Sequence, residues 1–410
     1  MSSFRLLLAA LTVSSLGNGV RWIAIPLLAA QLSADPVSVS VVVAAQQAPF
    51  LVFGLIAGVL ADRYDRKTLF WQAGVGRGLV MCGFTLVVLL GEPQIWMLAA
   101  VAFVLTCGDT IGTAAHAAMV PMLVPAEQRP KANSQIQAGN LIADPLVGAL
   151  VGAVLFGVSI ALPFGIDTVA FFAAAVCVAL IPGTFRPETS DARPRSTVRA
   201  DLAAGFQFLW HSRPLRKLCG LLALAQAIEA GAGAVLVLYV GKVLRLPAVG
   251  YGAIIFVFGV GGVIGALLSP RLARAVGERG ALLLGIAACV VSSLTMGLAH
   301  SPIAAFAAAA TYGAAMSVWN LLTIAVRQEL VPDALMGRVV STFRLLVFSV
   351  TPLAAIGSGL LADAHGLRAP FVAGSIGYVI ALGLAARRPP QRPEPPDPSG
   401  TRLRTESPVA

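Results

Sequence analysis

The sequence predicts an all-α integral membrane protein with twelve transmembrane helices in two pseudo-symmetric six-helix halves. Three observations lead to this prediction: the composition, a series of long apolar runs and an internal repeat. Hydrophobic residues make up 57% of the 410 positions, and charged residues only 12%. A soluble core could not bury so much apolar surface, so the natural solvent of this chain is a lipid bilayer.

Twelve apolar runs follow one another along the chain, and each approaches the roughly 20 residues that a helix needs to span the hydrocarbon. An even number of spans brings both ends of the chain to the same side of the membrane. The runs lie at 6–32, 38–61, 69–90, 95–119, 132–157, 162–181, 215–240, 248–270, 280–299, 303–326, 339–362 and 368–386.

Lysine and arginine gather in alternate connections between these runs, and the positive-inside rule places such connections in the cytoplasm. The basic connections are 63–67, 129–131, 186–217, 271–279, 327–338 and the tail from residue 387. The opposite loops contain only Lys242, Arg245 and Arg368. We expect a multi-pass protein of the cell (cytoplasmic) membrane with both termini in the cytoplasm. The net charge of +10 reflects this topology, so no nucleic acid partner is predicted.

The five cysteines stand singly inside apolar runs, without the spacing of a disulfide framework or a zinc site. We interpret them as core residues: Cys82, Cys107, Cys177, Cys219 and Cys289. The glycine-rich run at 259–265 follows no predicted strand and precedes no G-K-[ST], so a nucleotide loop is not indicated. We predict no enzyme activity, no catalytic residues, no metal and no cofactor.

The internal repeat has one constant offset of 207 residues. It indicates a parallel duplication, in which an axis normal to the membrane relates the halves and a substrate site lies between them. The pairs that share the offset are Pro125 with Pro332, Pro145 with Pro352, Pro163 with Pro370, Gly54 with Gly261, and Gly58 with Gly265.

This repeat divides the chain into an N-terminal half, 1–181, and a C-terminal half, 214–386. The segment 182–213 is predicted to be a cytoplasmic linker with an amphipathic helix, and 387–410 a disordered cytoplasmic tail rich in Pro, Arg and Glu. The apolar face of the linker helix should lie flat on the membrane surface. That face consists of Val198, Leu202, Phe206, Leu209 and Trp210.

Small residues four apart mark faces on which helices can pack closely. We expect them to serve either as sliding surfaces between the halves or as static packing. The pairs are Gly54 with Gly58, Gly261 with Gly265, Gly148 with Gly152, and Ala355 with Gly359.

Residues 58–67 read G-V-L-A-D-R-Y-D-R-K and separate two apolar runs. An ordinary charged hairpin would explain the charges, but the order resembles the signature G-x-L-a-D-r-x-G-r-k of the major facilitator superfamily. Asp65 stands where that signature has glycine. The resemblance implies a cytoplasmic gate, in which the loop latches onto the start of the eleventh helix. The residues of this gate are Gly58, Asp62, Arg63, Arg66, Lys67, Arg338 and Arg344, and Arg77 is expected to assist Asp62.

Further segments resemble the drug- and siderophore-exporting branch of that family, which includes macrolide and enterobactin exporters. These are L-G-N-G-V at 16–20, A-D-R-Y-D-R at 61–66, the linker helix, and G-R-V-V-S-T-F-R at 337–344. The resemblance implies a monomeric transporter that exports a small amphipathic compound by alternating access, driven by the proton gradient. Two departures weaken it: Asp144 replaces a glycine of the exporters' helix-five motif, and the span 95–119 lacks the arginine of many drug antiporters.

Ionisable side chains inside the spans are functional candidates, because a charge at the centre of a membrane helix costs about 2.5–3.5 kcal/mol on insertion scales. Asp109 and Glu229 are the predicted proton carriers, with Arg21 as modulator. The alternative is a fixed structural ion pair. The complete set predicted for proton coupling and the substrate cavity is Asn18, Arg21, Asp109, Asp144, Gln226, Glu229, Trp319 and Asn320.

Two other functions remain open from the sequence. The same fold could serve as a proton-coupled uptake symporter, since the residues do not fix direction. A non-transporting membrane receptor or assembly subunit is the second alternative, and the several ionisable residues within the spans argue against it.

Overall fold

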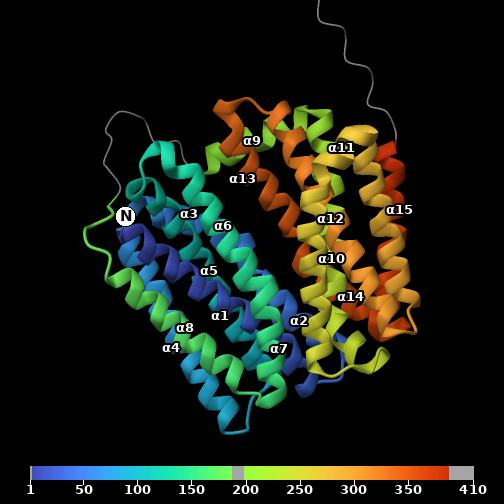
Figure 1. Ribbon diagram of the computed structural model, residues 1–410, viewed down its shortest axis with the longest axis horizontal. Helices are drawn as coiled ribbons and strands as arrows, with labels where there is room; N and C mark the ends of the chain where they lie inside the picture. Colours follow the sequence, from blue (N-terminus) through green and yellow to red (C-terminus); the bar gives the residue numbers. More distant parts are fainter. Residues whose placement is uncertain (1, 187–197, 387–410) are drawn as a thin grey trace, which may run out of the picture.

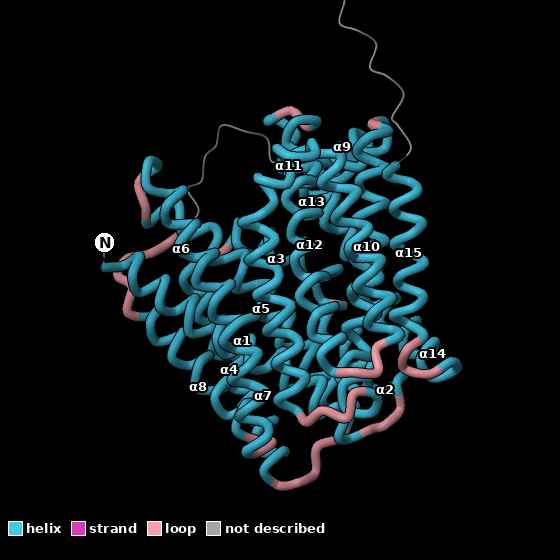
Figure 2. The backbone as a smooth tube through the Cα atoms, turned by 45° about the vertical axis from the view of Figure 1, so that its right-hand side comes forward, coloured by secondary structure: helices cyan, strands magenta, loops and turns pink. Residues whose placement is uncertain are grey.

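The computed structural model describes residues 2–186 and 198–386, and within these ranges every regular element is a helix (Figures 1 and 2). Side chains of a few helical positions, including Asp62, Asp201 and Leu202, lie outside the described residues, as do the tail from 387 and residues 187–197 of the linker. The helices stand side by side in two groups.

The N-terminal group contains the first six spans, of which the second and fifth are divided. Its elements are α1 Ser2–Leu32, α2 Pro36–Gln47, α3 Pro49–Arg63, α4 Arg66–Leu89, α5 Ile95–Leu123, the short η1 Ala126–Gln128, α6 Arg129–Leu141, η2 Ile142–Gly148, α7 Ala149–Val158 and α8 Leu162–Ala179.

The C-terminal group contains the other six spans, preceded by the linker helix α9 Val198–His211. Its elements are α10 Arg213–Leu238, η3 Tyr239–Val243, α11 Ala248–Leu298, α12 Pro302–Leu330, α13 Asp333–Ser349, α14 Thr351–His365 and α15 Ala369–Ala386.

Ten helical stretches in the described ranges are long and apolar enough to cross a membrane. The 51-residue α11 holds two spans, because Gly277 has a φ of 76° and breaks it where a residue without a Cβ can turn. The shorter α2 and α3 together make one more span. The predicted twelve-helix architecture is therefore confirmed.

Prolines explain why three predicted spans are divided. Proline lacks the N–H that would bond four residues back, so it interrupts the helical ladder. Pro49 separates α2 from α3, Pro145 lies in the π-helical η2, and Pro352 follows the break between α13 and α14. Each interruption alters the direction in which the following side chains project.

Most of the predicted small-residue faces are closely packed. A Cβ at Gly148 would lie 2.7 Å from Cα of Gly19 on α1, and Gly265 packs against Ala314 of α12, so these faces serve packing within a half. The prediction of a close helix approach at Gly58 is wrong. No described atom lies within 4 Å of a Cβ built there.

The two halves meet at the end of the molecule that carries α2, α7 and α14 (Figure 1). A Cβ at Gly359 of α14 would lie 2.6 Å from Oγ of Ser40 of α2, and one at Gly252 of α11 would lie 2.8 Å from the carbonyl of Ala149. Nζ of Lys242 also donates to the carbonyl of Ala34, at 2.6 Å. This end is closed in the structure.

Candidate functional site

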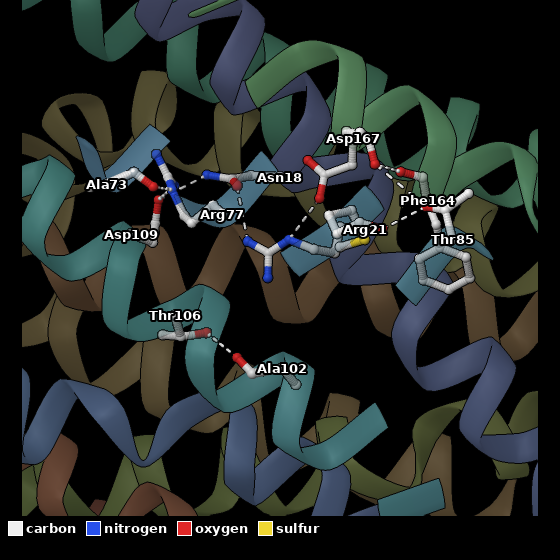
Figure 3. Close-up of polar contacts among 12 residues, drawn as sticks. Asn18, Arg21, Ala73, Arg77, Thr85, Ala102, Thr106, Asp109, Phe164 and Asp167 are labelled. Carbon is white, nitrogen blue, oxygen red and sulfur yellow. Dashed lines mark hydrogen bonds and ion pairs between the residues drawn. The ribbon is translucent and has the colours of Figure 1, made fainter. Parts of the chain in front are cut away.

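An ion pair between Arg77 and Asp109 links α4 to α5 in the N-terminal half. Nη1 of Arg77 lies 2.8 Å from Oδ1 of Asp109 (Figure 3). Gly108 leaves the room for it, since a Cβ there would lie only 2.7 Å from Cγ of Arg77. Arg77 is buried, but 28% of the Asp109 side chain is exposed. One side of this pair is therefore open to a polar molecule or a proton.

A second ion pair, between Arg21 and Asp167, links α1 to α8. Nε of Arg21 lies 3.2 Å from Oδ2 of Asp167, and both side chains are buried (Figure 3). A Cβ at Gly17 would lie 2.6 Å from Oδ1 of Asp167, so only glycine admits the carboxylate here. Removing one partner of such a pair leaves an uncompensated buried charge, at a cost of about 3–5 kcal/mol.

Asn18 joins the two pairs. Its Nδ2 donates to Oδ1 of Asp109 at 3.2 Å, and its Oδ1 accepts from Nη2 of Arg21 at 2.9 Å. The ring of Phe171 lies 4.5 Å from Cζ of Arg77 and 6.0 Å from Cζ of Arg21. We call Asn18, Arg21, Arg77, Asp109 and Asp167 the N-half network. Its charges are coupled, so a proton gained at Asp109 would weaken the hold on both Arg77 and Asn18.

A polar cavity of about 170 Å³ lies beside this network. Asp144 enters it from the π-helical turn η2, and its half-buried side chain has no hydrogen bond or ion pair to the described residues. The cavity can hold several waters or a small polar group. Its lining is Leu11, Ser14, Ser15, Asn18, Phe70, Arg77, Asp109, Gly112, Thr113, His116, Asn140 and Asp144.

The C-terminal half contains a different cluster. Gln226 lies 3.5 Å from the carboxylate of Glu229, and this carboxylate is within electrostatic range of Tyr312 and Tyr378. The hydroxyls of the two tyrosines are 2.6 Å apart, and the ring of Trp319 meets Tyr378 edge on, at 6.1 Å between centroids. We call Gln226, Glu229, Tyr312, Trp319 and Tyr378 the C-half aromatic cluster.

The structure divides the predicted site residues between these two places. Asn18, Asp109 and Asp144 line the cavity, while Gln226, Glu229 and Trp319 belong to the aromatic cluster. Asn320 is exposed on α12. A direct pair between Arg21 and Asp109 is wrong, because Asn18 lies between them and Arg21 pairs with Asp167.

Sequence reasoning missed Asp167 and the partner of Arg77. Arg77 pairs with Asp109 in the interior of the N-terminal half, a contact that was not predicted from the sequence. Both residues are ionisable and lie inside apolar runs, so the cost of a buried charge would have marked them. His116 lies within α5 and lines the cavity.

The loop between α3 and α4 is fixed to its own half. Arg66 donates to the carbonyl of Ala118 at 3.3 Å, and Lys67 donates to that of Ile181 at 2.5 Å. Asp65, which replaces the signature glycine, caps α4 through N–H of Thr68 at 2.9 Å and accepts from N–H of Phe185 at 2.6 Å. Partial burial raises the pKa of Asp65, but these hydrogen bonds outweigh it and hold the pKa below the usual value.

The described residues of the rest of the predicted gate lie at the end of α3 and on α13. Arg63 is exposed at the end of α3, and Arg338 and Arg344 are exposed on α13. The linker helix α9 packs on α13, since a Cβ at Gly205 would lie 2.5 Å from the carbonyl of Arg338. The side chain of Asp62 is outside the described residues, so the latch stays a prediction.

Two groups of six membrane helices with polar clusters in their interiors are typical of secondary transporters. The family model of the Major Facilitator Superfamily matches residues 7–355, so the chain belongs to that family. It is therefore a multi-pass membrane transporter and not an enzyme, as the sequence predicted.

Two relatives match over nearly the full length. The chain is 28% identical to the multidrug efflux pump Tap of Mycolicibacterium fortuitum, covering 93% of this chain and 94% of the pump. It is 26% identical to the enterobactin exporter EntS of Escherichia coli O1:K1 / APEC, covering 95% and 94%.

Solved structures confirm the fold. A bacterial homologue of the human lysosomal transporter Spinster, inward-facing and occupied, matches with a TM-score of 0.75 at 14% identity, over 93% of this chain and 95% of the homologue. The nucleoside transporter NupG matches with a TM-score of 0.72 at 11% identity, over 93% and 98%.

Proposed function

We propose that this transporter exports a small amphipathic compound from the cytoplasm, in exchange for protons, by alternating access. The observation that carries the proposal is the N-half network, because a partly exposed carboxylate held between a buried arginine and an asparagine can exchange a proton and pass the change to neighbouring helices. The two exporters among the relatives support the direction.

Asp109 is the proposed proton carrier, and Asp144 in the same cavity is the second candidate. With a proton on Asp109, the Arg77 ion pair loses its Coulombic part and α4 is held less firmly to α5. With the proton released, the pair reforms. Proton exchange would thus bias the N-terminal half between two arrangements, which is what coupling requires.

The proposed orientation has both termini in the cytoplasm, which makes the closed end the outer one and the conformation inward-facing. Cysteines at the exposed loop residues Glu92 and Glu127 test it in a chain stripped of its five native cysteines. An impermeant maleimide added to intact cells should label Glu92→Cys, and should label Glu127→Cys only after lysis. The opposite pattern overturns the orientation.

Transport direction and coupling are tested in two steps. The susceptibility and exported-metabolite profile of a deletion strain selects the compound. Everted membrane vesicles energised by respiration should then accumulate it, and a protonophore should abolish the accumulation. Asp109→Asn should show no proton-driven accumulation, whereas the loop variant Glu127→Gln should match wild type. Accumulation in right-side-out vesicles instead would indicate an uptake symporter, and no flux in either would indicate a receptor.

A further inference from the structure

In the C-terminal half, the residue equivalent by the internal repeat to each charged member of the N-half network is neutral. At the offset of 207 residues, Ile228 corresponds to Arg21, Leu284 to Arg77, Met316 to Asp109 and Gly374 to Asp167.

The structure supports this register in the C-terminal half. Arg21 meets Asp167 across α1 and α8, and Ile228 meets Gly374 across α10 and α15, where a Cβ on Gly374 would lie 2.8 Å from Cγ2 of Ile228. The same register matches Tyr378 to Phe171. The two halves therefore have the same arrangement of helices but different side chains at the equivalent positions.

In the N-terminal half, an aromatic ring and two carboxylates surround the positive charges of two arginine side chains. Phe171 lies beneath the guanidinium groups of Arg77 and Arg21, which Asp109 and Asp167 neutralise. This is the arrangement that favours a cation: a π-face to one side and an anionic oxygen to the other.

The C-terminal half has the ring and the carboxylate without the cation. Glu229 forms no ion pair with any residue that the structure describes, and Gln226 is the group that donates to it. Tyr378 occupies the place of Phe171, with Tyr312 bonded to its hydroxyl. The indole Nε1 of Trp319 is buried and has no acceptor among the described residues.

Access comes from α10 and α12. Gln226, Glu229 and Tyr312 are each partly exposed, whereas Tyr378 and Trp319 are buried. The exposed part of the cluster therefore belongs to the carboxylate residue, its amide neighbour and Tyr312, and the two inner rings form a packed floor. An ionised carboxylate at such a place is costly unless a counter-charge arrives.

We propose that the C-half aromatic cluster is a binding site for the cationic group, such as a protonated or quaternary amine, of an amphipathic aromatic substrate. Glu229 supplies the counter-charge, Gln226 orients it, and Tyr312 offers a π-face. The proposal deepens the exporter function and rests on it, since it names the class of compound that is exported.

The test measures binding to the full-length chain in detergent micelles, without a proton gradient. The probes are tetraphenylphosphonium and tetraphenylborate, which have the same shape and opposite charge, with binding to empty micelles subtracted. Wild type should prefer the cation. Glu229→Gln should weaken cation binding about tenfold or more and leave anion binding unchanged or stronger, and Tyr312→Leu should weaken the cation a fewfold, as cation–π energies suggest. Glu92→Gln, an exposed loop control, should match wild type.

Each result decides for or against the site. Equal affinity of wild type for the two ions, or unchanged cation binding by a folded Glu229→Gln, overturns the proposal, and the charge preference of wild type decides even where a variant does not fold. Because the assay contains no gradient, it is separate from transport. Cation binding without transport would contradict the exporter function but not the site. Proton-driven transport without a preference for the cation would contradict the site but not the exporter function.

Discussion

The two halves of this transporter share a fold but differ in how the charges in their interiors are neutralised. The N-terminal half contains two ion pairs whose four charges neutralise one another, and Asn18 joins them. The C-terminal half holds Glu229 among tyrosines and a tryptophan, without a cation at equivalent positions. On the two proposals above, a duplicated scaffold has separated two tasks: ion pairs that respond to protons in one half, and a carboxylate that accepts a ligand in the other.

The largest expected effect comes from breaking the buried pair. Asp167→Asn leaves Arg21 charged and unpaired between α1 and α8, so it should cost about 3–5 kcal/mol of stability and lower expression. Thermal unfolding in detergent measures it. The exposed carboxylate of Asp363 is the matched control, and Asp363→Asn should leave the unfolding temperature nearly unchanged.

Replacing the buried ion pair of the N-terminal half by apolar residues, as in the C-terminal half, should restore most of the lost stability. Replacing a buried pair by apolar residues is often neutral or stabilising, so Arg21→Ile combined with Asp167→Ala should recover most of the stability that Asp167→Asn loses. A double-mutant cycle on unfolding temperatures provides the measurement. If the double variant is less stable than either single variant, the pair is not the reason for the difference between the halves.

Asp109→Asn should separate coupling from stability. The side chain is partly exposed and asparagine can still accept a hydrogen bond from Arg77, so unfolding should change less than in Asp167→Asn, although Arg77 loses its counter-charge. Substrate binding should survive, while the substrate-induced pH change in proteoliposomes should vanish because this position can no longer exchange a proton. An intact proton flux in Asp109→Asn would leave Asp144 as the candidate carrier.

The smallest effect is expected at the closed end, where the repeat pairs Asp35 with Lys242. Asp35 caps α2 by accepting from N–H of Val37 and Ser38. Hydrogen bonds, first that from the hydroxyl of Ser38, hold its pKa below the usual 3.8, and Lys242 adds to this. Asp35→Ala should cost about 1 kcal/mol, as N-cap replacements do, and Asp35→Asn much less.

The pH dependence of that effect follows from the sign of the shift. A carboxylate whose pKa is lower in the folded state stabilises above its unfolded value and loses this contribution as pH falls through the folded one. The difference between wild type and Asp35→Ala should therefore be complete at pH 7 and shrink below about pH 4. A difference that is equally large at pH 3 would show that the charge of Asp35 is irrelevant to the cap.

The sequence by itself determined the class of protein and its plan. Composition, run length and the 207-residue offset are properties of the order of residues, because each helix must satisfy its own backbone in lipid. Likewise, the cost of charges in the bilayer marks Asp109, Asp144 and Glu229 as functional candidates whatever their neighbours are. Asp65 shows the limit of a signature: its departure from glycine is explained by the cap and the Phe185 contact that only the fold displays.

Only the tertiary structure decided which charges pair. Arg77 with Asp109, and Arg21 with Asp167, come from helices far apart in the chain, and their meeting depends on the rotation of each helix about its axis. That rotation is set by close approaches, such as those at Gly17 and Gly108, which no periodicity encodes. The sequence places each charge at a depth, and packing between helices chooses its partner.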